Sequence, residues 1–152
     1  MNRPALILLL LGTTWAGILP CSCARTERYP LHAAAREGLT SEVRRLLAGG
    51  MDVNTPDNFG MTALMEATRA GRLETVQALL ASGANVNAAG HENMTALMIA
   101  SFSGHTEITR LLVEKGAQVN IKNRAGMTPM MWAVQKGHQP VVEILKTAGA
   151  KE

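Results

Sequence analysis

The sequence contains very few aromatic residues and very few cysteines. Phe, Trp and Tyr together make up 3% of its 152 residues, whereas the apolar residues as a whole make up 47%. A core must therefore be built from Ala, Leu, Val and Met, a composition that favours helices over sheets. Both cysteines, Cys21 and Cys23, lie near the start, which excludes a disulfide or a cysteine-based metal site in the rest of the chain.

Runs of charge of one sign are also missing. The 15 basic and 12 acidic residues are scattered along the chain and leave a net charge of +3. No group of Lys or Arg forms a stripe for phosphates, so we expect no nucleic acid partner. The sequence also lacks a nucleophile elbow, a phosphate-binding glycine loop and a fixed pair of carboxylates. We therefore predict no catalytic residues, no cofactor and no bound metal, and a protein that is not an enzyme.

The first 24 residues differ in composition from the rest. A short cationic start precedes an apolar run over 5–19, and small residues follow it. This order is typical of a secretory signal peptide, because the apolar run is shorter than the roughly 20 residues that cross a bilayer. We predict a signal peptide over 1–24 and a periplasmic or secreted protein, with a retained membrane anchor as an alternative. Lipidation of Cys21 is a further alternative, since the residues before it loosely resemble a bacterial lipoprotein box, in which Pro20 is a poor fit.

The remainder of the sequence repeats itself every 33 residues. Four columns of identical residues keep this spacing across four copies, a regularity that chance does not explain. The columns are Ala34, Ala67, Ala100 and Ala133; Gly38, Gly71, Gly104 and Gly137; Leu46, Leu79, Leu112 and Leu145; and Gly50, Gly83, Gly116 and Gly149. We place the repeats at about 26–58, 59–91, 92–124 and 125–150, in one domain over 25–152.

Each copy is predicted to form two short helices and a projecting loop. Thr62, Thr95 and Thr128 have hydroxyls that can cap the start of a first helix, which the first glycine column ends. A second helix follows, and its apolar residues, such as Val76 and Leu79, recur at helical spacing. A Val-Asn step after the second glycine column predicts a short hairpin. The predicted fold is an all-α solenoid of four helix-turn-helix units with short β-hairpin loops.

The repeated motif resembles the ankyrin repeat. The signature of Thr-Pro-Leu-His, a trailing Ala-Ala, Gly, Leu-Leu and Gly-Ala-Asp-Val-Asn matches the sequence in order from roughly Tyr29 to Ala150. The first and last copies depart from the motif, as the end units of an open stack do. The resemblance is to an exported bacterial type of this family, and it implies a monomer that binds another protein as an adaptor, an inhibitor or an immunity-like factor.

The resemblance places the partner on the concave side, against hairpin tips and exposed positions of the first helices. Phe102 and Trp132 are predicted as anchors, because aromatic contacts dominate interface energetics. The competing interpretation is that Trp132 packs inward and Phe102 covers a gap. The tip residues predicted as a polar rim are Asp57, Asn58, His91, Glu92, Asn123 and Arg124. The predicted partner-binding residues are Glu66, Arg69, His91, Met94, Ile99, Phe102, Arg124, Met127, Trp132 and Gln135.

Two methionine columns leave a second functional hypothesis open. The columns are Met61, Met94 and Met127, and Met65, Met98 and Met131. Methionine commonly fills gaps between packed units. Alternatively, thioethers bind soft metals such as Cu(I) and react with oxidants, which would suit a periplasmic protective protein. Burial of Met98 and Met131 would favour the binding module, whereas exposure would favour redox or metal chemistry.

Overall fold

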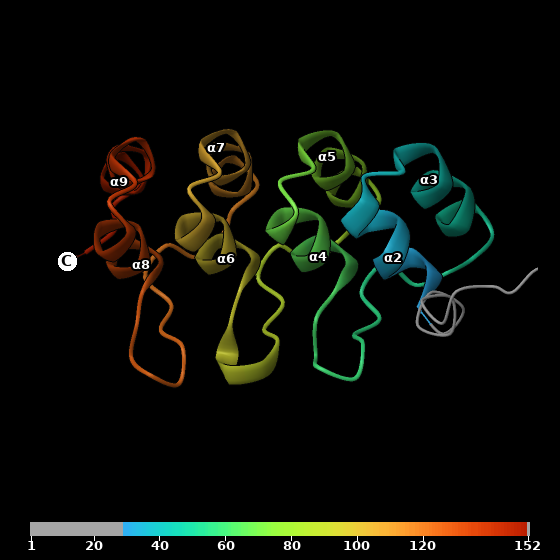
Figure 1. Cartoon of the computed structure of the whole chain (residues 1–152), viewed down its shortest axis with the longest axis horizontal. Coiled ribbons are helices and arrows are strands. Elements are labelled where there is room, and N and C mark those ends of the chain that lie inside the picture. The colour runs from blue at the N-terminus through green and yellow to red at the C-terminus, as the bar shows by residue number, and fades with distance from the viewer. Residues whose placement is uncertain (1–28, 152) are drawn as a thin grey trace, which may run out of the picture.

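The chain folds into a stack of helix pairs. The computed structural model describes residues 29–151, and this part contains eight α-helices, one short 3-10 helix and no β-strand. The helices form two parallel rows (Figure 1). The inner row consists of α2 (Pro30–Glu37), α4 (Ala63–Arg69), α6 (Ala96–Ser103) and α8 (Pro129–Lys136). The outer row consists of α3 (Thr40–Ala48), α5 (Leu73–Ala81), α7 (Thr106–Glu114) and α9 (Gln139–Thr147).

The all-α solenoid predicted from the sequence is confirmed for the described residues. The predicted signal peptide and Cys21 lie outside them. Within 29–151 no helix has the length and apolarity needed to span a bilayer.

The predicted caps of the inner helices are confirmed. Thr62, Thr95 and Thr128 each accept a hydrogen bond on the side-chain oxygen from the backbone N–H three residues on, at N···O distances of 3.4, 3.3 and 3.2 Å. The first inner helix lacks such a cap and begins instead with Pro30, whose fixed φ suits the first turn. The inner helices therefore start at the same register in successive repeats.

One continuous core runs between the two rows. Each inner helix packs against the inner helix of the next repeat, so equivalent positions of successive inner helices are buried and each repeat completes the core of the next. One such series is Leu31, Leu64, Leu97 and Met130, each at most 2% exposed. The outer helices contribute Leu79, Leu112 and Leu145, all fully buried. The alanine column on the inner helices lets α2, α4, α6 and α8 approach closely, because Ala has almost no side chain to separate them.

Asparagine side chains join each repeat to the next. Asn87 donates from Nδ2 to the carbonyl of Gly116 (3.2 Å) and accepts on Oδ1 from the N–H of Gln118 (2.8 Å). Asn54 and Asn120 make the same pair of bonds one repeat earlier and one repeat later. Backbone groups that helix ends leave unpaired are thus satisfied across the boundary between repeats.

The loops that project from the inner row, here called fingers, differ from the predicted β-hairpins. The base of each finger is closed by a backbone hydrogen bond, such as that from the Asp57 N–H to the Met61 carbonyl (2.8 Å), and a second backbone bond forms the turn, such as that from the Gly60 N–H to the Asp57 carbonyl (3.0 Å). The carboxylate of Asp57 also accepts from the N–H groups of Phe59 and Met61, and Asn123 accepts from the N–H of Met127. Because side chains take the place of ladder partners, no strand forms in the described fingers. Asp57 and Asn123 are therefore turn residues and not the free polar rim that was predicted.

Candidate protein-binding groove

A groove with a volume of about 860 Å³ lies between the fingers and the inner helices, and it extends over the second, third and fourth repeats. Six of the ten predicted partner-binding residues line it. They are Arg69, His91, Met94, Ile99, Phe102 and Trp132, and they are joined there by Phe59, Met61, Glu92, Ser103 and Asn123. The helices α4, α6 and α8 supply one wall, and the fingers supply the other. The spacing of the repeats thus gathers residues that are far apart in the sequence.

An aromatic pair forms the floor of the groove. The rings of Phe102 and Trp132 meet edge to face, with centroids 5.3 Å apart and planes at 78°. This geometry is one that aromatic pairs prefer, because the edge of one ring is positive and the face of the other is negative. The Nζ of Lys136 lies 4.3 Å from the centroid of the Phe102 ring. Phe102 is therefore held by contacts on two sides while its side chain stays 42% exposed.

Trp132 combines the two interpretations that the sequence left open. Its side chain lines the groove but is only partly exposed, and its Nε1 is buried without a hydrogen-bond acceptor among the described residues. It therefore packs inward and faces the groove at the same time. Replacing Trp132 by alanine would remove core contacts as well as groove surface, so we expect it to lower the free energy of unfolding as well as the affinity for a partner.

Phe59 was not predicted as a site residue. It lies in the first finger, lines the groove and is 67% exposed, the most exposed large apolar side chain among the described residues. The signal was present in the sequence, since an aromatic residue next to the polar tip residues Asp57 and Asn58 has no reason to be there for packing. The prediction treated all tips as a polar rim and so overlooked it.

Two predicted residues are buried, contrary to their assignment as exposed helix positions. Ile99 is 8% exposed and Glu66 is 6% exposed. The Glu66 carboxylate accepts a hydrogen bond from the guanidinium of Arg69 at 2.7 Å, one turn further along α4. Burial of a carboxylate requires such a partner, because the charged form loses its hydration. Ile99 still contributes to the groove floor, whereas Glu66 serves to orient Arg69.

The remaining predicted residues lie at the edges of the groove or away from it. Arg124 is exposed and lies 3.8 Å from a carboxylate oxygen of Glu92, which His91 also approaches at 3.7 Å. Met127 is half-buried at the base of the third finger, and Gln135 is exposed on α8 without lining the groove. Arg124, Met127 and Gln135 are therefore not part of the lining of the groove.

The middle finger holds an unusual backbone conformation beside the groove. Glu92 and Asn93 both have positive φ angles, 57° and 58°, which non-glycine residues rarely adopt. The Nδ2 of Asn93 donates to the carbonyl of Lys122 at 2.7 Å, and the N–H of Arg124 donates to the carbonyl of Glu92 at 2.9 Å. These bonds to the next finger hold the conformation, so the groove wall is fixed by its neighbours.

The histidines outside the fingers have structural partners. His105 and His138 donate from Nε2 to the carbonyls of Arg69 (3.4 Å) and Phe102 (3.1 Å) in the preceding repeat. The His138 ring covers Gly104, where a Cβ atom would come within 2.7 Å of the ring. His32 donates in the other direction, to the carbonyl of Met61 at 2.9 Å. Among residues 29–151, no three His, Cys, Asp or Glu side chains gather as metal ligands.

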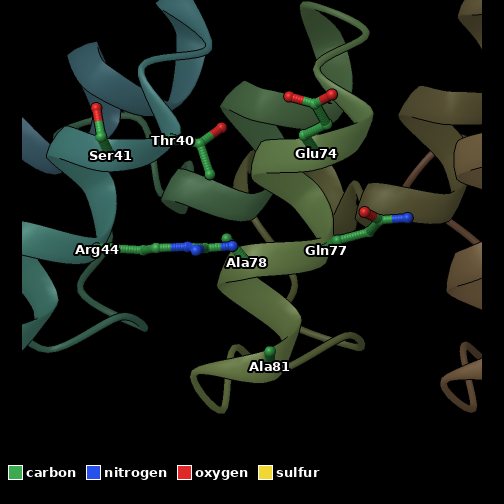
Figure 2. A pocket seen from close by; sticks show the side chains of 7 residues that line it. All are labelled: Thr40, Ser41, Arg44, Glu74, Gln77, Ala78 and Ala81. Atoms are coloured by element: carbon green, nitrogen blue, oxygen red, sulfur yellow. The ribbon is translucent and has the colours of Figure 1, made fainter.

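The outer row carries a second depression of different character. It has a volume of about 660 Å³ and lies between α3 and α5, lined by Thr40, Ser41, Arg44, Glu74, Gln77, Ala78 and Ala81. Figure 2 shows the long Arg44 side chain extending from α3 towards α5. None of the lining residues is aromatic. A similar depression lies between α7 and α9, two boundaries further along the outer row. This recurrence indicates that the depressions are gaps between adjacent outer helices, which the regular spacing of the repeats produces.

Comparison with known protein families agrees with the repeat architecture. A family model described as ankyrin repeats (3 copies) matches residues 2–90 and 87–151. The search of curated proteins gave no significant match. Ankyrin repeats are generic modules for protein–protein interaction, and proteins built from them are typically not enzymes. Because these matches span nearly the whole sequence, the chain belongs to the ankyrin repeat family.

Proposed function

We propose that this protein is an exported binding module that acts as an adaptor, an inhibitor or an immunity-like factor for another exported protein. The observation that carries the proposal is the aromatic surface of the groove. Phe59 and Phe102 are 67% and 42% exposed on a protein whose sequence is only 3% aromatic. Exposed aromatic side chains that line one groove are the usual anchors of protein interfaces.

The rigidity of the groove supports this proposal. The aromatic floor is built on helices. The middle finger is bonded to the first through the His91 N–H and the Phe59 carbonyl, and to the third through a backbone bond and the side chain of Asn93. A surface that is already ordered loses little conformational entropy when a partner binds. The groove therefore needs no rearrangement to receive an apolar side chain.

The methionine hypothesis has less support. Met65 and Met98 are 1% and 0% exposed, as expected for side chains that fill space between repeats. Met131 is half-buried, and Met61 and Met94 contribute to the groove wall. The Sδ of Met94 accepts a hydrogen bond from Asn123 at 3.6 Å, so that sulfur has a structural role in the third finger. Burial of Met98 favours the binding module over chemistry that needs exposed sulfur.

Site-specific photo-crosslinking tests the proposed site. A photo-reactive residue in place of Phe102, in the full chain expressed in its native envelope, should capture one protein, which mass spectrometry then identifies. The same residue in place of Gln77, which lines the depression on the outer row, serves as the control and should not capture it. Capture of the same protein from both positions, or from Gln77 alone, would contradict a partner in the groove.

Export is a separate part of the proposal and has its own test. Mass spectrometry of the intact protein purified from the envelope should give the mass of a chain that starts after Cys23 or Ala24. A chain that starts at Cys21 with added acyl groups would indicate a lipid anchor instead. Recovery of the unprocessed chain from the cytoplasm alone would contradict export.

A further inference from the structure

We propose that the groove receives a partner segment in which a large apolar side chain is flanked by carboxylates. The inference rests on the proposed function and specifies the chemistry of the segment that is bound. Its basis is the arrangement of charge around the aromatic floor, because the apolar residues alone would accept many sequences.

The apolar part of the segment is set by the floor. Phe102 and Trp132 meet edge to face there, Ile99 lies beside them, and Phe59 projects from the finger opposite. The floor is too apolar to hydrogen-bond a polar side chain placed on it, so burial of such a group would cost free energy. An aliphatic or aromatic side chain would instead bury apolar area against four apolar neighbours.

The charged part of the segment is set by two cations at the sides of the floor. Lys136 lies over the Phe102 ring, and among the described residues no carboxylate pairs with it. Arg69 is 55% exposed and donates one hydrogen bond to Glu66, which leaves further N–H donors of its guanidinium for a ligand. A partner carboxylate would find a donor at either position, whereas a partner lysine or arginine would be repelled.

The acidic residue in the groove does not offset these cations. Glu92 is already approached by the guanidinium of Arg124 at 3.8 Å, and the His91 ring lies 3.7 Å from the same carboxylate oxygen. Glu66 is buried under Arg69 and does not face a ligand. The groove thus combines an apolar floor with a cation at one side, Lys136, that no carboxylate of the described residues pairs, and with spare guanidinium donors of Arg69 at the other, which complements an acidic and apolar segment.

The spacing of the cations predicts the spacing of the carboxylates. Arg69 belongs to α4 and Lys136 to α8, with α6 between them. Packed helices lie roughly 8–10 Å apart, so α4 and α8 are separated by roughly 16–20 Å along the stack, and the two charged groups lie no further apart than that because the Lys136 Nζ reaches back over Phe102 of α6. An extended chain covers this distance in about five or six residues. The segment would therefore carry acidic residues about that far apart, with the apolar side chain between them.

Binding of synthetic peptides to the full chain tests the inference. The probe is a fluorescein-labelled peptide with a central Leu-Phe and glutamates at the predicted spacing on either side. One control peptide has lysines in place of the glutamates, and another has serines in place of Leu-Phe. Fluorescence anisotropy should give a dissociation constant for the probe at least about tenfold lower than for either control.

Charge variants of the protein locate the effect. Lys136→Gln should weaken binding of the probe by about three- to fivefold and leave the lysine peptide no weaker. The matched control is Arg44→Gln, which makes the same change of charge on the outer row and should leave probe binding unchanged. Both side chains are exposed, so both variants should fold, which circular dichroism can verify.

Equal binding of the glutamate and lysine peptides, or equal losses from Lys136→Gln and Arg44→Gln, would overturn the inference. Failure of all three peptides to bind would overturn it as well. Capture of a protein from position 102 in that case would leave the proposed function standing and show that its bound segment has other chemistry. If the groove prefers the glutamate peptide but position 102 captures no exported protein, the inference about the bound segment stands and the proposed function fails.

Discussion

The two sides of the stack are built from the same repeat but expose different residues. On the finger side, Phe59, Phe102 and Trp132 line one groove that extends over three repeats. On the outer side, the depression between α3 and α5 is lined by small and polar residues, with Arg44 across it. Both depressions arise from the regular spacing of helices. Of these two depressions, only the groove on the finger side is lined by exposed large apolar side chains, and this difference distinguishes a binding surface from a packing gap.

The largest effect is expected from substitutions in the core that both sides of the stack share. Leu97 of α6 and Leu112 of α7 are 1% and 0% exposed, and they belong to the inner and outer rows respectively. Leu97→Ala and Leu112→Ala should each lower the free energy of unfolding by about 3 kcal/mol, through lost apolar burial and the cavity left behind. Urea denaturation followed by circular dichroism measures the loss.

The control for these variants is Leu39→Ala. Leu39 is 49% exposed, so this substitution should cost well under about 1 kcal/mol. A large loss for only one of Leu97→Ala and Leu112→Ala would mean that the two rows do not depend on a single interior.

A substitution on the floor of the groove should separate binding from stability. Phe102→Ala should weaken binding of the crosslinked partner by about 2 kcal/mol or more, because a central aromatic anchor is lost. Its side chain is 42% exposed, so we expect the unfolding free energy to fall by no more than about 1 kcal/mol. Calorimetric titration with the purified partner and urea denaturation measure the two effects. A large loss of stability with unchanged affinity would assign Phe102 to the core.

Much of the fold could be predicted from the sequence because its determinants are local and repeated. Thr62, Thr95 and Thr128 cap helices through a bond that spans three residues, and glycines such as Gly104 end them in the left-handed conformation. The absence of β-strands in the described fingers was harder to predict. It depends on side-chain acceptors, such as Asp57, that replace the expected ladder.

The candidate site was less predictable because exposure depends on neighbouring repeats. The helical pattern placed Glu66 on the partner side, but it could not show that Arg69 would fold back and cover it. The same limit applies to Trp132, whose burial follows from its contact with Phe102, one repeat away. Phe59 was missed for another reason. It lies in a finger and not in a helix, so helical periodicity gave no indication of whether its side chain is exposed. Predicting the site would have required the distances between side chains of neighbouring repeats as well as the period of the sequence.

The asparagine links between repeats should matter more in the middle of the stack than at its end. Asn87→Ala removes two hydrogen bonds between the second and third repeats and should lower the unfolding free energy by about 1–2 kcal/mol. Asn120→Ala removes the equivalent bonds to Gly149 and Lys151, where only the final residues are held, so we expect a loss below about 1 kcal/mol. Urea denaturation compares the two variants. Equal losses would argue against this difference between middle and end.

The smallest predicted effect concerns an exposed ion pair on the outer side. The Nε of Arg45 donates to Glu42 at 2.8 Å, and this hydrogen bond holds the pKa of Glu42 below its ordinary value of 4.5 and raises that of Arg45. Because the pKa of Glu42 is lowered by folding, its contribution is present above pH 4.5 and is lost as the pH falls through the folded value. Both side chains are in contact with water, so the contribution to stability is small and is screened by salt. NMR titration of the Glu42 carboxyl carbon should give a pKa below 4.5 in the wild type and a higher value in Arg45→Gln. An unchanged pKa of Glu42 in Arg45→Gln would mean that the ion pair contributes nothing to the stability of the folded protein.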